Sequence, residues 1–173
     1  MSALKQQQAQ RLKQRRRRQA QRLSVTIDWQ TASLKGLMTP LVMKAVRLAW
    51  LGAGKATVNL ALVDLLTSQT LNNEWRGKDK PTNILSFPFE LPEGWEDRQQ
   101  LLGDLVVCVP VVQQEAEQQG KVLADHMAHL LVHGLLHLQG YDHENEQDAE
   151  QMEALETALL AQLGIHDPYT ITE

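Results

Sequence analysis

Three histidines in one short segment, His133, His137 and His143, constrain the fold and chemistry of this chain more than any other feature. His133 and His137 are four residues apart, so on a helix their side chains lie one turn apart on the same face. Gly140 can adopt the positive φ that ends a helix, which lets His143 turn back towards the other two. Three imidazoles around one point, with a fourth position left to water, are typical of a catalytic zinc site. We therefore expect a metal-binding histidine helix that holds one Zn²⁺ per chain.

The spacing of these histidines matches the zinc-binding pattern of the metzincin proteases at every position but one. Those proteases carry a glutamate directly after the first histidine, where it acts as general base on the metal-bound water. This chain has Gly134 at that position, which has no side chain. The sequence therefore predicts the metal site without the base of a protease, and this difference argues against peptide hydrolysis.

The length and composition of the chain are those of a one-domain protein. It has 173 residues, of which 43% are hydrophobic, enough for one core. No apolar run approaches the roughly 18 residues needed to span a bilayer, so we expect no membrane association. Cys108, the only cysteine, lies in an apolar segment at residues 105–112. We expect it to be buried and reduced, with no disulfide partner, as in a cytoplasmic protein.

The net charge of −4 conceals a basic N-terminal extension at residues 1–22. All 21 acidic residues lie in the rest of the chain, residues 23–173. Two interpretations of the extension stand: it binds a polyanion, or it is a disordered and solvated tail. Either way we expect a disordered basic extension at 1–22 and a single domain at 23–173. The basic residues of the extension are Lys5, Arg11, Lys13, Arg15, Arg16, Arg17, Arg18 and Arg22.

Hydrophobic periodicity and turn residues predict four strands and about five helices. We expect strands at 23–28, 55–63, 84–89 and 105–109, with a surface excursion at 90–102. We expect helices at 40–53, from 64 towards 75, and at 111–119, 122–138 and 145–163. Such a succession favours an α+β or α/β fold with one sheet layered with helices. The order of the strands does not follow from the pattern.

The helix expected at 122–138 carries two more histidines, His126 and His129, on the same stripe as His133 and His137. Four imidazoles are too many for one metal ion. We interpret His126 and His129 as helix-face residues that form hydrogen bonds with neighbours or water. For His129 the alternative is an outer residue that orients a metal ligand.

Two further motifs accompany the histidine segment. Residues 133–143, HGLLHLQGYDH, resemble the signature of the YbeY family of bacterial endoribonucleases. Residues 75–89, WRGKDKPTNILSFPF, resemble the second recognisable stretch of that family, and Leu102-Gly103-Asp104 also fits it. The three motifs occur in the family's order within residues 24–165, and the two long ones are specific.

This resemblance implies a single-strand-specific, metal-dependent endoribonuclease in maturation of the 16S rRNA 3′ end and in late-stage ribosome quality control. It implies an α+β fold with a four-stranded mixed sheet packed with about five helices, so that residues 23–173 form a single metal-dependent ribonuclease domain. The resemblance assigns one Zn²⁺ to His133, His137 and His143, with His133 also counted as catalytic. The implied partners are ribosomal RNA and the small ribosomal subunit. Arg76 matches an arginine of the family that serves RNA binding or catalysis.

The segment after Trp75 is rich in positive charge. The planar guanidinium of Arg76 suits a phosphate or a phosphoryl transition state, and Lys78 and Lys80 add to the same substrate-binding patch. The alternative for Arg76 is a surface residue paired with Asp79 or Glu74. We expect Trp75 to be buried beside the sheet, with stacking on a base as the alternative.

The chemistry of the reaction stays open at this point. A zinc-bound hydroxide can attack phosphorus directly, or it can act as base for the 2′-hydroxyl of RNA. Two other functions also stand. One is a zinc hydrolase of another substrate class, and the other is a non-enzymatic, ribosome-associated zinc protein.

Overall fold

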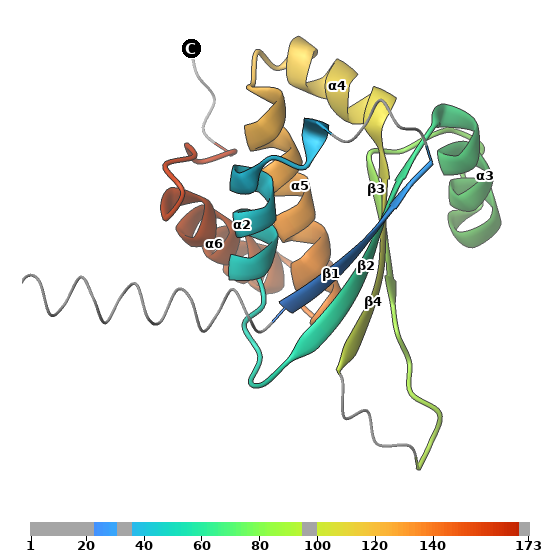
Figure 1. Cartoon of the computed structure of the whole chain (residues 1–173), viewed down its shortest axis with the longest axis vertical. Coiled ribbons are helices and arrows are strands. Elements are labelled where there is room, and N and C mark those ends of the chain that lie inside the picture. Colours follow the sequence, from blue (N-terminus) through green and yellow to red (C-terminus); the bar gives the residue numbers. More distant parts are fainter. Residues whose placement is uncertain (1–22, 31–35, 95–99, 170–173) are drawn as a thin grey trace, which may run out of the picture.

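The computed structural model describes residues 23–30, 36–94 and 100–169 (Figure 1). The predicted basic extension at 1–22 lies outside the described residues. Within the described ranges, no helix has both the length and the apolar character needed to cross a bilayer.

Four strands form one mixed sheet in the order β1-β2-β4-β3 (Figure 1). β1 (Leu23–Trp29) is parallel to β2 (Ala56–Val63), and β2 is parallel to β4 (Leu101–Cys108). β3 (Ile84–Pro88) lies at the edge, antiparallel to β4. The structure thus confirms the four-stranded mixed sheet. It also supplies the strand order, in which β2 and β4 pair at the centre although β3 lies between them in the chain.

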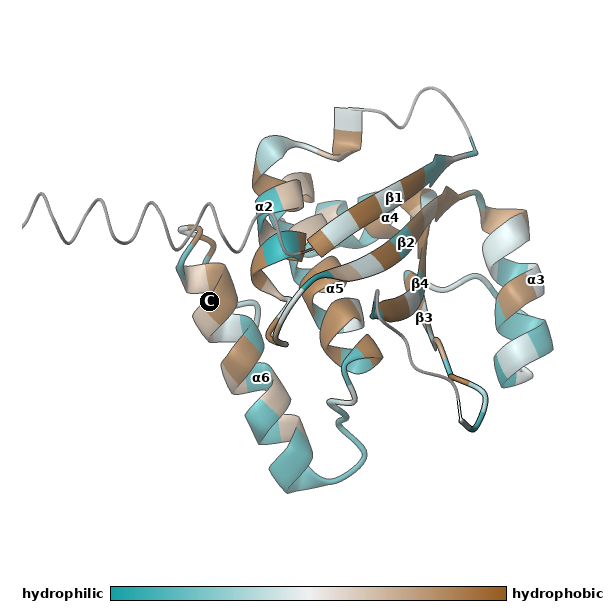
Figure 2. Cartoon of the chain, turned by 60° about the horizontal axis from the view of Figure 1, so that its bottom comes forward, coloured by the Kyte–Doolittle hydropathy of each residue, from teal (hydrophilic) through white to brown (hydrophobic). Residues whose placement is uncertain are grey.

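The helices are distributed unequally over the two faces of the sheet (Figures 1 and 2). α5 (Leu123–Leu138) lies against one face, with α2 (Pro40–Leu48) and α6 (Glu146–Ala161) packed against it. α3 (Leu65–Arg76) lies on the opposite face, and α4 (Val109–Gln118) follows β4 directly. These are the five helices of the described residues that the predicted fold requires.

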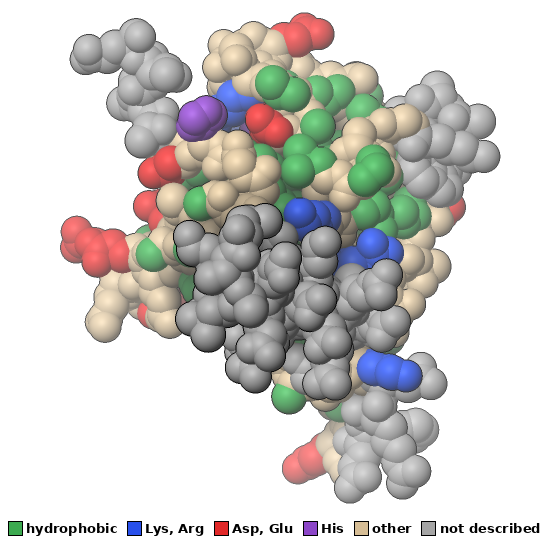
Figure 3. Space-filling model, turned by 60° about the vertical axis from the view of Figure 1, so that its left-hand side comes forward, with side chains coloured by type: hydrophobic (Ala, Val, Ile, Leu, Met, Phe, Trp, Pro, Cys, Tyr) green, Lys and Arg blue, Asp and Glu red, His purple; other side chains and the backbone are tan. Residues whose placement is uncertain are grey.

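α5 is the centre of the main core because it is apolar almost all round (Figure 2). Met127, Leu131 and Leu135 are fully buried and pack in one cluster with Leu60 and Leu105 of the sheet. A second cluster lies on the other face, beneath α3, and contains Val63, Leu85, Val106 and Cys108. Cys108 is buried with a free thiol, as predicted. On the outer surface seen in Figure 3, acidic and basic side chains are interspersed with hydrophobic ones.

Gly134 allows α5 to approach the sheet closely. A Cβ atom at this position would lie 2.8 Å from Cδ1 of Ile84 in β3 and 2.9 Å from Cδ2 of Leu105 in β4. Both distances are shorter than van der Waals contact, so a side chain here would force the side chains of Ile84 and Leu105 to shift within the packed core. Packing therefore gives a physical reason for glycine at the position where metzincin proteases carry their base.

Several element boundaries differ from the predicted ones. α2 ends at Leu48 rather than near residue 53, because the side chain of Gln139, the residue directly after α5, forms hydrogen bonds with the backbone that follows α2. It donates to the Ala49 carbonyl (2.7 Å) and accepts from the Leu51 amide (2.9 Å). α4 begins at Val109, with Pro110 in its first turn, where a missing amide costs nothing.

β4 begins at Leu101, so Gly103 and Asp104 lie inside the strand and not before it. Gly103 has φ +134°, and a Cβ atom there would lie 2.1 Å from the Phe87 carbonyl oxygen of β3. Only glycine at position 103 allows the β3 backbone at Phe87 to lie this close to β4. The expected surface excursion is therefore shorter than 90–102.

Candidate metal centre

The three histidines of the predicted metal site meet at the C-terminal end of α5. One ring nitrogen from each of His133, His137 and His143 lies within 4.8 Å of the other two. The Nε2 atoms of His133 and His137 are 3.1 Å apart. The ring of His143 lies 4.9 Å from that of His137 and 5.6 Å from that of His133, between centroids. Within the described part of the chain, this is the one group of three or more potential ligands so arranged.

A glycine-dependent helix end brings His143 back to the other two rings. The Tyr141 amide donates to the Leu136 carbonyl (3.1 Å), and the Gly140 amide donates to the His137 carbonyl (3.0 Å). These two bonds form a Schellman motif, with Gly140 in the left-handed position at φ +90°. The chain therefore reverses as the sequence predicted.

The hydrogen bonds of two rings fix which nitrogen faces the site. Nδ1 of His133 lies 2.6 Å from the Glu156 carboxylate, and Nδ1 of His137 lies 2.9 Å from the Tyr141 carbonyl. A carboxylate and a carbonyl only accept hydrogen bonds, so each Nδ1 carries a proton, and Nε2 is the nitrogen left to present a lone pair to a metal ion.

When both rings are neutral, the two Nε2 lone pairs face each other across 3.1 Å, and a cation beside both would offset their repulsion. Two nitrogens at about 2.0–2.1 Å from a tetrahedral zinc ion are separated by roughly 3.3 Å. The donor set therefore fits Zn²⁺. Burial, together with the charges of His133 and His143, lowers the pKa of His137, which keeps its ring in the neutral form that binds a metal.

A fully buried carboxylate, Glu156 of α6, supports this group from behind. It accepts hydrogen bonds from His133 Nδ1 (2.6 Å), from His129 Nε2 (2.9 Å) and from the Tyr169 hydroxyl. Burial alone would raise the pKa of Glu156, but the hydrogen bonds from His129, His133 and Tyr169 outweigh it and lower the pKa to about 2. Such a carboxylate orients a metal-ligating imidazole and increases its basicity.

Glu156 is not among the site residues predicted from the sequence, although the sequence carries a signal for it. Glu156 shares the buried stripe of α6 with Met152, Leu159 and Leu160. A carboxylate at a core position of an amphipathic helix requires strong hydrogen-bond donors. His129 is one of those donors, so it forms a hydrogen bond with a neighbour as expected, and it is linked to His133 only through Glu156. His126 instead lies 2.8 Å from Glu115 and has the expected role of a helix-face residue.

The histidines open into a pocket of about 650 Å³. Arg76 and Lys78 line it, whereas Lys80 does not. Among the described residues that line the pocket there is no aspartate or glutamate, so its charged groups are cationic or titratable imidazoles. The structure therefore brings two of the three predicted phosphate-binding residues to the metal centre. The other lining residues are Thr82, Asn83, Ile84, Ser86, His129, Leu130, His133, His137, His143 and Tyr169.

Arg76 is the last residue of α3, and the loop after it, which carries Lys78 and Lys80, is tethered to that helix. The buried Ser68 hydroxyl donates to the Thr82 carbonyl (3.0 Å), and the buried Asn72 amide donates to the Lys80 carbonyl (2.7 Å). The second bond turns the backbone of Lys80 towards α3.

Arg76 forms no ion pair with a carboxylate of the described residues. Asp79, one of the acidic neighbours considered for it, accepts from the Gln69 amide instead (2.9 Å). The guanidinium is therefore not neutralised by the described part of the protein.

The expectation that Trp75 is buried beside the sheet is wrong. Its side chain is 68% exposed and meets Phe87 edge-on, with 5.5 Å between ring centroids. α3 covers only part of its face of the sheet, so Trp75 stands at the rim of a separate hollow that Asn59 and Asp104 also line. Trp75 does not line the pocket of the three histidines.

A family model and curated relatives all place this chain near the same family. The model of the family described as Endoribonuclease YbeY matches residues 7–164. The protein called Endoribonuclease YbeY from Alkalilimnicola ehrlichii is 55% identical over 120 residues, which cover 69% of this chain and 72% of that protein. The protein of the same name from Halorhodospira halophila is 59% identical over 117 residues, covering 67% and 75%.

A solved structure has a similar fold. The solution structure of TM1509 from Thermotoga maritima aligns with a TM-score of 0.51 at 23% sequence identity. The alignment covers 86% of this chain and 100% of that one. At this identity the likeness supports the fold alone.

Proposed function

This chain belongs to the YbeY family of endoribonucleases, and we propose that it is a metal-dependent endoribonuclease that cleaves single-stranded RNA. The observation that carries the proposal is the pocket in which three histidines converge beside Arg76. A polyanionic substrate fits a pocket whose described lining has cationic groups and no carboxylate. A peptidase would require a carboxylate base there, so the same observation disfavours peptide hydrolysis.

Each residue has a specific task in this proposal. His133, His137 and His143 hold one Zn²⁺, which when bound supplies a Lewis acid for a phosphoryl oxygen and lowers the pKa of a coordinated water. Glu156 and the Tyr141 carbonyl hold the rings of His133 and His137 so that Nε2 faces the ion.

Arg76 and Lys78 bind the phosphates on either side of the cleaved bond and orient the strand. Arg76 also stabilises the negative charge that develops at phosphorus. Lys80 lies outside the pocket, and we assign it to the approach of the flanking RNA rather than to the reacting phosphate.

The biological substrate follows from the motif resemblance rather than from the geometry. We expect the chain to act on the 3′ end of 16S rRNA and in late-stage ribosome quality control, with the small ribosomal subunit as partner, in the cytoplasm. The ribonuclease domain is residues 23–173. The basic residues of the 1–22 extension would add sequence-independent affinity for RNA.

The deciding experiment combines elemental analysis of the purified protein with cleavage of a single-stranded RNA, with and without a chelator. We expect about one zinc per chain and cleavage that the chelator abolishes. His137→Ala should lose both the metal and the activity. His166→Ala is the matched control, because His166 is exposed and does not line the histidine pocket.

Other outcomes would contradict the proposal. Cleavage that resists the chelator and survives in His137→Ala would remove the metal-dependent mechanism. RNA binding with a steep salt dependence but no cleavage by the zinc-loaded protein would favour a non-enzymatic ribosome-associated protein instead.

A further inference from the structure

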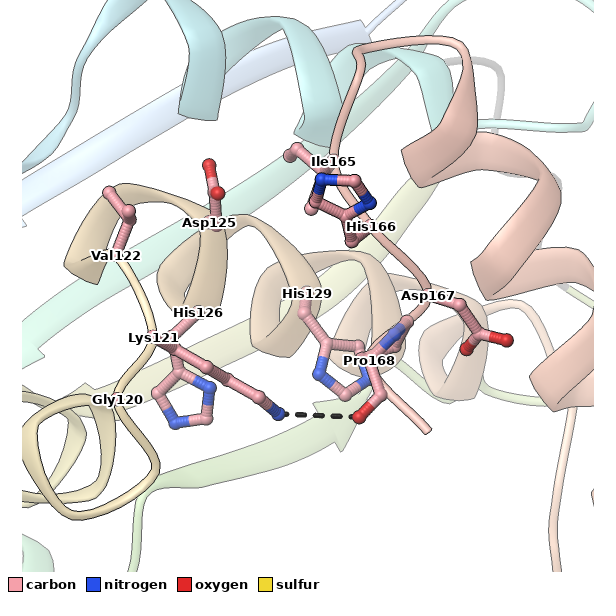
Figure 4. Close-up of a pocket in the computed structure, with 10 residues that line it drawn as sticks. All are labelled: Gly120, Lys121, Val122, Asp125, His126, His129, Ile165, His166, Asp167 and Pro168. Carbon is pink, nitrogen blue, oxygen red and sulfur yellow. Dashed lines mark hydrogen bonds between the residues drawn. The ribbon is translucent and has the colours of Figure 1, made fainter. Parts of the chain in front are cut away.

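The segment that follows α6, residues 165–169, turns back along α5 and is fixed there by several contacts (Figure 4). Ile165 is buried in the main core. The Lys121 ammonium donates to the Pro168 carbonyl (3.3 Å), and the Thr157 hydroxyl donates to the Asp167 carboxylate (3.3 Å). Figure 4 shows His129 beside Pro168, at the floor of the small pocket that this segment borders. The segment therefore lies beside α5, the helix that carries His133 and His137.

Tyr169, at the end of this segment, lines the histidine pocket and forms a hydrogen bond with Glu156 through its hydroxyl. Its side chain is 42% exposed and lines the histidine pocket. Its ring meets the His129 ring edge-on, with 5.5 Å between centroids. The hydroxyl donates to Oε2 of Glu156, and its burial together with this carboxylate raises the pKa of Tyr169.

The contacts of Glu156 are divided between its two carboxylate oxygens. Oε2 accepts hydrogen bonds from the Tyr169 hydroxyl and from His129 Nε2. Oε1 accepts one hydrogen bond, from His133 Nδ1. Two donors on Oε2 stop the carboxylate from rotating, so Oε1 stays directed at Nδ1 of His133. A rigid carboxylate keeps the His133 proton on Nδ1 and the lone pair on Nε2. The orientation of one candidate metal ligand thus depends on a tyrosine on a different element.

We propose that Glu156 and Tyr169 are positioning residues of the metal centre: Tyr169 holds the Glu156 carboxylate, and Glu156 holds His133 in the orientation that binds the ion. The inference rests on the metal centre of the proposed function. It makes Tyr169 part of that centre.

The test measures the zinc affinity of the full chain by competition with a chromogenic chelator, together with thermal unfolding of the metal-free proteins. Glu156→Gln should weaken zinc binding about 10- to 100-fold, the usual effect of losing an outer partner of a ligand. An amide cannot accept from His133, His129 and Tyr169 at once, because its nitrogen is a donor. Tyr169→Phe, which keeps the ring, should weaken binding about fivefold, the factor that corresponds to one ordinary hydrogen bond.

Glu153→Gln is the matched control, because it removes an exposed carboxylate one turn earlier on α6. It should bind zinc as the unaltered chain does. Zinc affinities of Glu156→Gln and Tyr169→Phe equal to that of Glu153→Gln would overturn the inference. So would variants whose metal-free forms melt earlier but bind zinc with unchanged affinity, since the residues would then be only structural.

Tyr169→Phe decides the matter if Glu156→Gln does not fold, because Tyr169 is partly exposed and its ring is retained. The zinc affinity of the unaltered chain distinguishes failure of this inference from failure of the proposed function. If the unaltered chain binds no zinc, the metal centre itself is refuted. If it binds zinc and the variants bind equally well, only the roles of Glu156 and Tyr169 are refuted.

Discussion

Replacing Gly134 with alanine tests the reason we give for glycine beside the first histidine. Two opposing effects set the expected change in the free energy of unfolding. Alanine is favoured over glycine inside a helix by about 1 kcal/mol. The added methyl group would lie 2.8 Å from Cδ1 of Ile84 and 2.9 Å from Cδ2 of Leu105, and overpacking of a core typically costs about 1–3 kcal/mol. The net expectation is a loss of about 1 kcal/mol, although alanine is the better helix former.

A second substitution isolates the steric effect. Ile84→Val deletes Cδ1, the atom nearest to the new methyl group, and by itself costs about 0.5–1.5 kcal/mol. In that background Gly134→Ala should cost less, so the double variant should be more stable than the sum of the single changes by about 1 kcal/mol. Ile165→Val is the matched control, since Ile165 is as buried as Ile84, each 8% exposed. Its effect should add to that of Gly134→Ala.

Urea denaturation of the metal-free proteins, followed by circular dichroism, measures these free energies. Additive effects in the Gly134→Ala, Ile84→Val pair would refute the packing explanation. A Gly134→Ala protein more stable than the unaltered chain would do the same, because helix propensity would then outweigh contact with the sheet.

Three further predictions address charge, pH and helix capping. Arg76→Lys keeps the positive charge but loses the planar guanidinium that can bind a phosphate through two hydrogen bonds. The rate of RNA cleavage in single-turnover assays should therefore fall about 10- to 100-fold at unchanged zinc content. An unchanged rate would argue against contact between Arg76 and a phosphate. The pKa of Glu156 is lowered from 4.5 to about 2, so its ionised form stabilises the metal-free protein above about pH 4.5 and this stability is lost as the pH falls towards 2. Urea titrations should show a loss of about 3 kcal/mol across that window in the unaltered chain and a smaller one in Glu156→Gln; equal losses would contradict the assignment. Asn145 caps α6 by accepting from the Asp148 amide (2.9 Å), and Asn145→Ala should cost about 1 kcal/mol in the same assay, whereas no change would show that the cap is dispensable.

The sequence by itself determined the features that depend on local spacing. His133 and His137 share a face because four residues make about one helical turn, and Gly140 ends the helix because it accepts a positive φ. The same kind of reasoning predicted the strands and helices to within a few residues. Each of these outcomes depends on interactions between residues that are close in the chain.

Only the tertiary structure decided the features that depend on distant contacts. Glu156 reaches His133 from another helix, and Tyr169 joins them only because the chain turns back after α6. The strand order, the exposure of Trp75 and the extension of β4 through Gly103 likewise depend on which surfaces pack together. Hydrophobic periodicity identifies the buried face of each element, but it does not specify which other element covers that face. The candidate ligands could therefore be predicted from the sequence, whereas the residues that hold them in place could not.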